Sequence, residues 1–330
     1  MLLDSLTMRV KILGSAAGGG FPQWNCACGN CRGLRSGTFR GKARSQTQVA
    51  ISATSKNDAG SWYLLGASPD LRAQIEATPE LHPQPGKEKE GIRQSPIAGA
   101  VLANADIDHV LGLLLLRELQ PLRVYATDSI RRILCEDNSM FGMLQRVPGQ
   151  ATWTSFEPGI AFPLENPGGE NSGLRCRALS LGTHYPAYVS PRRQSELRFG
   201  EASLGLIVEA KMVESSSGKR LAYMPAVPQI DNALLQEFES ADVLLFDGTF
   251  WSDDELIRIQ GSGQTALQMG HVPVSSAEGS LSRLAGLRHP RKIYLHINNT
   301  NPMLNEAGPE YAQVREAGWE IAEDGWEFEL

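Results

Sequence analysis

Four polar residues fall within six positions of the chain, between two apolar stretches. They are Asn104, Asp106, Asp108 and His109. The preceding residues 97–103 are small or β-branched, which is typical of a buried strand, and the apolar run 110–119 predicts a helix packed under a sheet. Because packing fixes both flanks, carboxylates and an imidazole placed between them could hold a metal ion. The alternative is that Asp106 or Asp108 only caps the start of the helix.

A second group of candidate ligands lies near the start of the chain. Cys26, Cys28 and Cys31 form a C-x-C-x-x-C pattern, with Gly29 to ease the turn. Clustered thiols without an export signal favour a metal over disulfides, and three thiolates suit a soft or borderline cation such as Zn²⁺. Structural zinc takes four ligands, so one must come from elsewhere in the chain. The other two cysteines, Cys135 and Cys176, sit in apolar patterns that predict buried packing.

The composition excludes several classes of protein. The chain has 330 residues and a formal net charge of −6, and no basic run with interleaved aromatics suggests nucleic-acid binding. The longest uncharged apolar run, residues 110–116, is too short to span a bilayer, and no secretory signal is evident. We therefore expect neither a membrane span nor export through a signal peptide. Residues 1–7 are expected to be an N-terminal extension before the first strand.

Strand patterns and helix patterns, which must position the candidate ligands, alternate along the whole chain. Short strand patterns interspersed with helices predict an α/β sandwich whose helices cover two sheets. The run 122–126 predicts a strand, and 128–138 a helix with Asp128 as its cap. Neither a linker nor a repeat divides the sequence, so we expect a single domain over residues 1–330. The glycine-rich stretch 14–22 could cradle a phosphate, but no Lys-Ser/Thr follows, which favours a tight loop.

The first polar cluster resembles the His-x-His-x-Asp-His signature of the metallo-β-lactamase superfamily. Asp108 and His109 match the signature, whereas Asn104 and Asp106 stand where its first two histidines would be. The resemblance implies a metallo-β-lactamase-like αββα sandwich of two mixed sheets, with helices on the outer faces.

The cysteine cluster is similar to that of one branch of this superfamily, which includes a phosphonate-pathway phosphodiesterase. In that branch a Cys-x-Cys-x-x-Cys and a late histidine hold a structural zinc. By this resemblance Cys26, Cys28, Cys31 and His271 are the ligands of such a zinc. From the residues alone, His271 could equally be a histidine of a surface loop.

The resemblance also implies an open metal site. His184 and His296 follow strand patterns in the places of the superfamily's third and last histidine motifs, and either Met224 or Asp247 stands at the bridging position. One metal set, Asp108, His109 and His296, is then intact. Two imidazoles and a carboxylate with vacant positions suit non-haem Fe(II) and O₂, although other divalent ions would also bind.

The neighbouring metal set has lost its two leading imidazoles. It consists of Asn104, Asp106 and His184, which would line the vacated site and bind substrate polar groups or a second ion. This loss disfavours a dinuclear hydrolase, which uses two ions to activate water. It leaves open a pocket that only binds a ligand, or polar groups that only satisfy one another.

Over nearly the whole chain the motifs look like those of the pyrroloquinoline quinone (PQQ) synthesis protein B family. The stretches that carry the resemblance are residues 9–26, 106–118, 269–275 and 295–302. It implies a cytoplasmic protein with a part in the synthesis of PQQ from a Glu and a Tyr of a precursor peptide. We expect an Fe(II)- and O₂-dependent hydroxylase of the tyrosine-derived ring of a Glu–Tyr intermediate, which would be an oxidoreductase.

Two alternatives stay open. One is a non-catalytic carrier for transport of PQQ or its precursor towards the periplasm, and the other is a metal-dependent hydrolase. The expected partners are the small-molecule substrate and other proteins of the pathway, without nucleic acid or a membrane span, and a homodimer is compatible with the sequence. Trp251 and Phe250 could stack on an aromatic ring or belong to the core.

Overall fold

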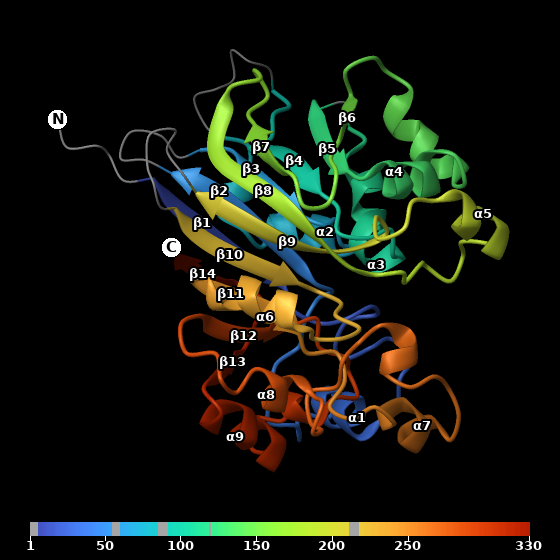
Figure 1. Cartoon of the computed structure of the whole chain (residues 1–330), viewed down its shortest axis with the longest axis vertical. Coiled ribbons are helices and arrows are strands. Elements are labelled where there is room, and N and C mark those ends of the chain that lie inside the picture. The colour runs from blue at the N-terminus through green and yellow to red at the C-terminus, as the bar shows by residue number, and fades with distance from the viewer. Residues whose placement is uncertain (1–5, 55–59, 85–91, 119, 211–217) are drawn as a thin grey trace. The chain divides into compact units, whose positions relative to one another are not determined.

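The computed structural model forms two compact units, each built from separate stretches of the chain (Figure 1). Unit 1 comprises residues up to 13, 48–219 and 325–330, and unit 2 comprises 14–47 and 220–324. The structure describes residues 6–54, 60–84, 92–118, 120–210 and 218–330. Most of the expected N-terminal extension, residues 1–5, therefore lies outside the described residues. None of the helices in the described ranges is long and apolar enough to cross a bilayer.

Unit 1 contains a seven-stranded mixed sheet in the order β14-β1-β2-β3-β4-β5-β6. Strands β3 to β6 are parallel to one another, whereas β1 pairs with β14, and β2 with β3, in antiparallel fashion. The strands are β1 (Thr7–Gly14), β2 (Gln48–Thr54), β3 (Trp62–Leu65), β4 (Ile97–Val101), β5 (Leu122–Ala126), β6 (Ala151–Ser155) and β14 (Trp326–Glu329). All five residues of β4 are buried, as expected for a central parallel strand.

An antiparallel layer packs on this sheet within unit 1. It consists of β7 (Ala161–Glu165), β8 (Asn171–Gly182) and β9 (Ser203–Ala210). The ring of Phe162 stacks on Phe156 with centroids 4.6 Å apart and on Tyr125 at 5.6 Å. These aromatic contacts bury the inner faces of both layers and fix their separation.

The helices of unit 1 are short. They are α2 (Leu71–Glu76), α3 (Ile107–Val110), α4 (Asp128–Cys135) and α5 (Pro191–Glu196), with 3₁₀ turns η1 (Pro79–Leu81), η3 (Leu111–Leu116) and η4 (Ser139–Gln145). The expectation that Asp128 caps α4 is wrong, because the preceding Thr127 occupies the cap and its hydroxyl accepts the amide of Ile130 at 3.2 Å.

The apolar run 110–119, expected to form one helix, changes its geometry after the first turn. It continues as the 3₁₀ turn η3, and Leu119 lies outside the described residues. The carbonyl of His109 accepts the amide of Ala67 at 2.6 Å, and the amide of Gly112 donates to the Ala67 carbonyl at 2.9 Å. Both groups would bond internally in a longer α-helix, so these contacts with residue 67 end it. A Cβ at position 112 would lie 2.2 Å from the Ser68 carbonyl oxygen, which explains the glycine.

Unit 2 contains four parallel strands in the order β13-β12-β11-β10. They are β10 (Lys219–Met224), β11 (Val243–Asp247), β12 (Arg291–Leu295) and β13 (Trp319–Ile321). The helices of this unit are α1 (Gly29–Arg35), α6 (Asn232–Glu239), α7 (Glu255–Gln260), α8 (Ser280–Arg283) and α9 (Pro309–Glu316), with 3₁₀ turns η5 (Leu267–Met269) and η6 (Pro302–Leu304).

Aromatic packing holds these strands together, and the ring of Tyr294 stacks on Trp319 at 4.1 Å. The carboxyl ends of parallel strands meet at one edge of a sheet, which places the residues after β11 and β12 side by side.

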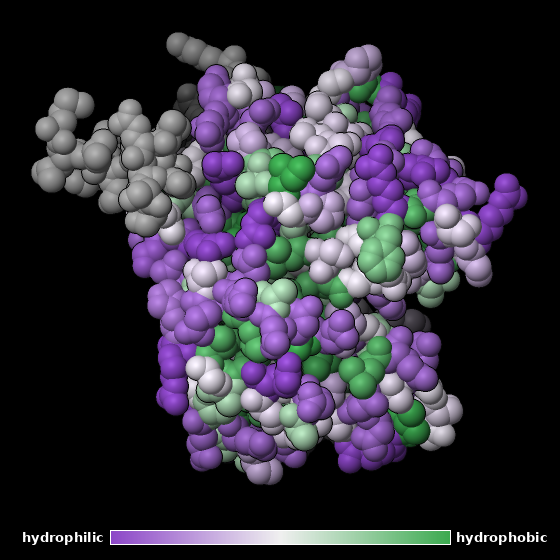
Figure 2. Space-filling model, in the orientation of Figure 1, coloured by the Kyte–Doolittle hydropathy of each residue, from purple (hydrophilic) through white to green (hydrophobic). Residues whose placement is uncertain are grey.

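The face of the molecule drawn in Figure 2 is mainly hydrophilic, with apolar residues in small groups between polar ones. Large apolar side chains are exposed at scattered positions, among them Ile92 at 91% and the aromatic residues Trp24 and Phe199 at 84% each.

Candidate metal centres

The polar cluster of unit 1 lies between β4 and α3. The Asn104 side chain is buried, and its Oδ1 accepts the backbone amide of Asp106 at 3.0 Å. Asp106 occupies the cap position of α3, but its side chain makes no capping hydrogen bond, and Asp108 lies inside the first turn. The cap alternative therefore does not account for the two carboxylates.

His109 is almost completely buried, at 3% exposure, and is held from two sides. Its amide donates to the Asp106 carbonyl at 2.9 Å, and its own carbonyl accepts from Ala67. Its Nε2 lies 3.8 Å from Oδ2 of Asp108, so the two side chains present their ligand atoms to the same region. Gly66, with φ of +80°, lies against the ring, where a Cβ would be 3.3 Å from the His109 carbonyl oxygen.

The segment between β8 and β9 carries His184 and Tyr188. His184 is half-buried, and the Tyr188 hydroxyl donates to the carbonyl of Ala105, within the polar cluster. Burial raises the pKa of Tyr188, and the nearby charge of Asp106 raises it further. The phenol is therefore a neutral hydrogen-bond donor to the 104–109 loop at physiological pH.

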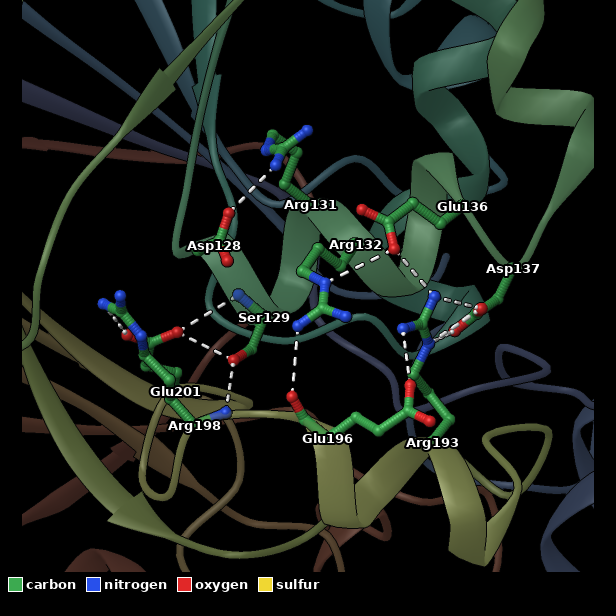
Figure 3. A network of polar contacts seen from close by, with 10 residues as sticks. All are labelled: Asp128, Ser129, Arg131, Arg132, Glu136, Asp137, Arg193, Glu196, Arg198 and Glu201. Atoms are coloured by element: carbon green, nitrogen blue, oxygen red, sulfur yellow. Dashed lines mark hydrogen bonds and ion pairs between the residues drawn. The ribbon is translucent and has the colours of Figure 1, made fainter.

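Ion pairs anchor this segment to α4, as Figure 3 shows. Arg193 on α5 lies 2.8 Å from a carboxylate oxygen of Glu136 and 2.7 Å from one of Asp137. At the other end of the segment, the buried Glu201 carboxylate accepts from both the hydroxyl (2.7 Å) and the amide (3.1 Å) of Ser129. The segment that bears His184 is thus fastened at two points, at its middle to the residues that follow α4 and at its C-terminal end to α4 itself.

In unit 2 a hydrogen-bond network centres on Asp247, at the end of β11, whose side chain is completely buried. Its Oδ1 accepts the Thr249 hydroxyl at 2.6 Å and the Thr249 amide at 3.0 Å. Its Oδ2 accepts the Val227 amide at 2.9 Å and lies 2.8 Å from Nδ1 of His271. Burial alone would raise the pKa of Asp247, but the His271 and His296 rings and these hydrogen bonds bring the pKa below its ordinary value.

These four contacts occupy both oxygens of the Asp247 carboxylate in this structure. Met224, the other candidate for the bridging position, is a buried thioether at the end of β10 and carries no carboxylate. Phe250 is also buried, with its ring centroid 5.9 Å from that of His271, and belongs to the core.

The same network orients two imidazoles. The Thr249 hydroxyl has one proton and two acceptors, Oδ1 of Asp247 at 2.6 Å and the His296 carbonyl at 2.9 Å. The carboxylate is the nearer acceptor and is charged, so we assign the proton to it, and Nδ1 of His296, at 2.8 Å, is then the donor to Thr249. In that tautomer Nε2 of His296 is unprotonated, which is the form that binds a metal. Nδ1 of His271 donates to Asp247, and the His271 and His296 rings stack with centroids 5.5 Å apart. The ligand atoms of Asp247, His271 and His296 lie within 4.8 Å of one another.

The three clustered thiols of unit 2 lie together as expected, with Sγ atoms within 4.8 Å of one another. Cys28 caps α1 and accepts the Cys31 amide at 3.5 Å, which orients the turn. Burial raises the pKa of Cys31 to about 11. Burial also tends to raise the pKa of Cys26, but hydrogen bonds from Cys28, Cys31 and Asn299 outweigh it and lower the pKa. A soft divalent cation fits this donor set, because it would replace the thiol protons that burial retains.

The fourth group at the thiols differs from the expected His271, which the structure places in the Asp247 network instead. The side-chain amide of Asn299 lies at the thiols, with Nδ2 3.2 Å from Sγ of Cys26 and 3.3 Å from Sγ of Cys31. The amide nitrogen and oxygen have nearly the same shape, so a half-turn would present Oδ1 to a cation. Sequence reasoning missed Asn299, and its only signal is its place three residues after His296.

A cavity of about 550 Å³ opens beside the thiols within unit 2. Uncharged polar side chains form much of its wall, namely Gln23, Asn25, Gln260, Asn298 and Thr300. Cys26 and Cys28 also line it, so a cation can reach the thiols from solvent.

The chain was compared with known families and structures. The beta-lactamase superfamily domain matches residues 61–297. The coenzyme PQQ synthesis protein B of Azotobacter vinelandii is 41% identical over 323 residues, covering 98% of this chain and all of that protein. That of Methylobacterium radiotolerans is 39% identical over 331 residues, with the same coverage. The chain belongs to the coenzyme PQQ synthesis protein B family.

Solved structures agree with membership of the PQQ synthesis protein B family. The crystal structure of Zn²⁺-bound PqqB from Methylobacterium extorquens superposes with a TM-score of 0.84, at 38% identity over 98% of this chain and all of the other. A diphosphatase of the PhnP family, 18% identical over 99% of this chain and 98% of its own, shares the fold with a TM-score of 0.62. The expected metallo-β-lactamase-like fold of mixed sheets and helices is confirmed.

Proposed function

We propose that this protein acts in PQQ synthesis as an Fe(II)- and O₂-dependent hydroxylase of the tyrosine-derived ring of a Glu–Tyr precursor. Its iron ligands are Asp108, His109 and His296. The place in the pathway is supported by identity of about 40% to coenzyme PQQ synthesis proteins B over nearly the whole chain. The three proposed ligands support the reaction, because two imidazoles and one carboxylate leave coordination positions of the iron open for O₂ and substrate.

The observation that carries the proposal is the hydrogen bond between Thr249 and Nδ1 of His296. It selects the tautomer whose Nε2 can bind a metal, and a buried carboxylate, Asp247, holds the hydroxyl in turn. Two candidate ligands, Asp108 and His109, come from the motif of unit 1, and His296 follows β12 in unit 2.

A bound Fe(II) would supply the activation of O₂. The protein's own groups would hold and orient the substrate. We assign the neighbouring metal position of the superfamily, which lacks the two leading histidines here, to substrate binding. Its residues are Asn104, Asp106 and His184, and the amide and the carboxylate among them can bind polar groups of a Glu–Tyr substrate. The Tyr188 hydroxyl, bonded to the Ala105 carbonyl, keeps that loop in place.

The second metal proposal is a structural Zn²⁺ held by Cys26, Cys28 and Cys31. The PqqB relative of known structure binds Zn²⁺, and the thiol geometry here fits a tetrahedral ion. We assign the fourth position to Asn299 rather than to His271.

Turnover is the direct test of the reaction. Apo-protein would be loaded with Fe(II) without oxygen, and then mixed with a Glu–Tyr substrate, O₂ and ascorbate. Hydroxylation puts one oxygen atom on the ring and the other into water, so ascorbate must supply two electrons. We expect a product with one added oxygen atom, lost in His296→Ala and retained in His289→Ala, a change at an exposed histidine.

Other results would overturn the hydroxylase. Absence of product, together with PQQ binding that survives His296→Ala, would support the carrier. Metal-dependent cleavage of model esters would support the hydrolase.

A further inference from the structure

The loop that follows β12 connects His296 with the residue that contacts the thiols, Asn299, three positions later, all within unit 2. His296 begins it, and Asn299 reaches the thiols. Three residues span at most about 11 Å of extended chain. A displacement of the backbone at Asn299 is therefore transmitted to the backbone at His296.

Side-chain bonds stiffen this loop along its length. Asn298 Nδ2 lies 2.5 Å from the Thr300 hydroxyl, and the Thr300 hydroxyl donates to the buried Glu255 carboxylate. The Asn301 amide donates to the carbonyl of Gly248 at 2.9 Å, on the strand-end loop that carries Thr249. The loop is therefore held on several sides, at Asn298, Thr300 and Asn301.

The thiol end is also fixed through the backbone. The Asn30 side chain, on α1 between two of the cysteines, donates to the Asn299 carbonyl at 3.1 Å and to the Asn301 carbonyl at 3.0 Å. Asn299 thus contacts the cysteine turn with both its side chain and its main chain. An ion drawn between the thiolates would act directly on these contacts.

The other end carries conformational strain. His296 has φ of +56° and is the only non-glycine residue with positive φ in the described parts of the chain. Side chains with a Cβ rarely adopt this region, so surrounding contacts must hold it there. The Ile297 amide donates to Ser15 at 3.0 Å, and the Asn298 amide donates to the Thr249 carbonyl at 3.1 Å. Loosening the loop would release His296 from its metal-binding orientation.

We propose that the thiol centre is a control site for the His296 centre: a divalent metal bound by Cys26, Cys28 and Cys31 with Asn299 locks the 296–301 loop and raises metal affinity at His296. This inference rests on the proposed assignment of His296 as a metal ligand. Because coupling between sites is reciprocal in binding free energy, an ion at His296 also raises the affinity of the thiols for their metal by the same factor.

Cobalt(II) binding tests the coupling without any turnover. The protein is first loaded with one equivalent of Zn²⁺, which the thiolates hold, and Co²⁺ is then titrated while its d–d absorption is followed. We expect Asn299→Ala to keep its zinc, since three thiolates and a water remain, but to bind Co²⁺ roughly tenfold more weakly than wild type. Asn299→Asp retains a ligand oxygen and should stay close to wild type. Asn305→Ala, the same change further along the segment, is the matched control.

Equilibrium competition for zinc with a chelator is the reciprocal measurement. Added Co²⁺ should raise the zinc affinity of the wild type about tenfold and leave that of Asn299→Ala unchanged. Equal Co²⁺ affinity in wild type and Asn299→Ala, with zinc retained in both, would overturn the coupling alone. A wild type that binds zinc but no Co²⁺ elsewhere would overturn both the coupling and the proposed iron centre.

Discussion

The Thr249 hydroxyl lies 2.8 Å from Nδ1 of His296 and donates its own proton to Asp247 at 2.6 Å. A threonine therefore links a buried carboxylate to the histidine that ends β12. Groups behind a ligand commonly set the orientation and basicity of the imidazole, and their loss weakens metal binding.

Removing that hydroxyl should weaken the metal site. In Thr249→Val the shape is kept, but Nδ1 of His296 loses its acceptor, and we expect iron affinity to fall about 10–100-fold. Equilibrium titration with Fe(II) under anaerobic conditions measures it. Thr249→Ser retains the hydroxyl and should keep affinity near wild type. Equal affinity in the valine and serine variants would rule out this role.

Zinc content and folding should depend together on the thiol cluster. In Cys28→Ser we expect zinc to drop from about one ion per chain to near zero, because the set loses a thiolate and the cap of α1 changes. The melting temperature should fall with it. Elemental analysis and thermal unfolding measure the two effects, with Cys135→Ser as the matched control. Unchanged zinc and melting in Cys28→Ser would contradict the site.

Glu255 should make stability depend on pH. Burial raises its pKa to about 7, although hydrogen bonds from Thr300 and Trp251 oppose the shift. A raised pKa means that the folded state holds the proton more tightly, so this contribution is present below pH 4.5 and is lost as pH rises to 7. Its size is on the order of 3 kcal/mol.

Replacing Glu255 isolates that contribution. Between pH 5 and 8, the free energy of unfolding of Glu255→Gln should fall less than that of wild type. Glutamine keeps one acceptor oxygen for the Trp251 amide or the Thr300 hydroxyl and loses the other, which lowers the stability of the variant without adding a titrating group. Denaturant unfolding at both pH values measures the difference, and the exposed change Glu316→Gln should behave as wild type. Parallel pH profiles for wild type and Glu255→Gln would show that the carboxyl does not titrate in this range.

Arg193 should control the opening of the segment that carries His184 and Tyr188. It pairs with Glu136 and Asp137 and is only 15% exposed, so its loss frees two carboxylates as well as α5. We expect Arg193→Ala to speed proteolysis and hydrogen exchange of residues 183–202 roughly tenfold, equivalent to about 1.4 kcal/mol. Arg192→Ala, at a side chain that is 89% exposed, provides the control. Similar hydrogen-exchange rates in Arg193→Ala and Arg192→Ala would show that Glu201, and not Arg193, holds residues 183–202 in place.

Local chain patterns predicted the parts of the site that are close in sequence. The C-x-C-x-x-C spacing brings three sulfurs together in one turn and the start of α1, with little help from distant residues. The position of the Asn104–His109 loop at the end of a strand could likewise be predicted, because the apolar residues before it form a buried strand. In contrast, the helix expected over 110–119 ends early, because distant backbone at residue 67 takes its hydrogen bonds.

The sequence by itself determined the family motifs, the thiol cluster and the strand ends that carry polar residues. Only the tertiary structure decided which distant residues complete each centre: His271 pairs with Asp247, and Asn299 reaches the thiols across 268 positions of sequence. Such pairings depend on which strands lie side by side, and β11 and β12 become neighbours only when the sheet forms. Local spacing constrains contacts within a turn, whereas contacts between strand ends follow from the topology of the whole sheet.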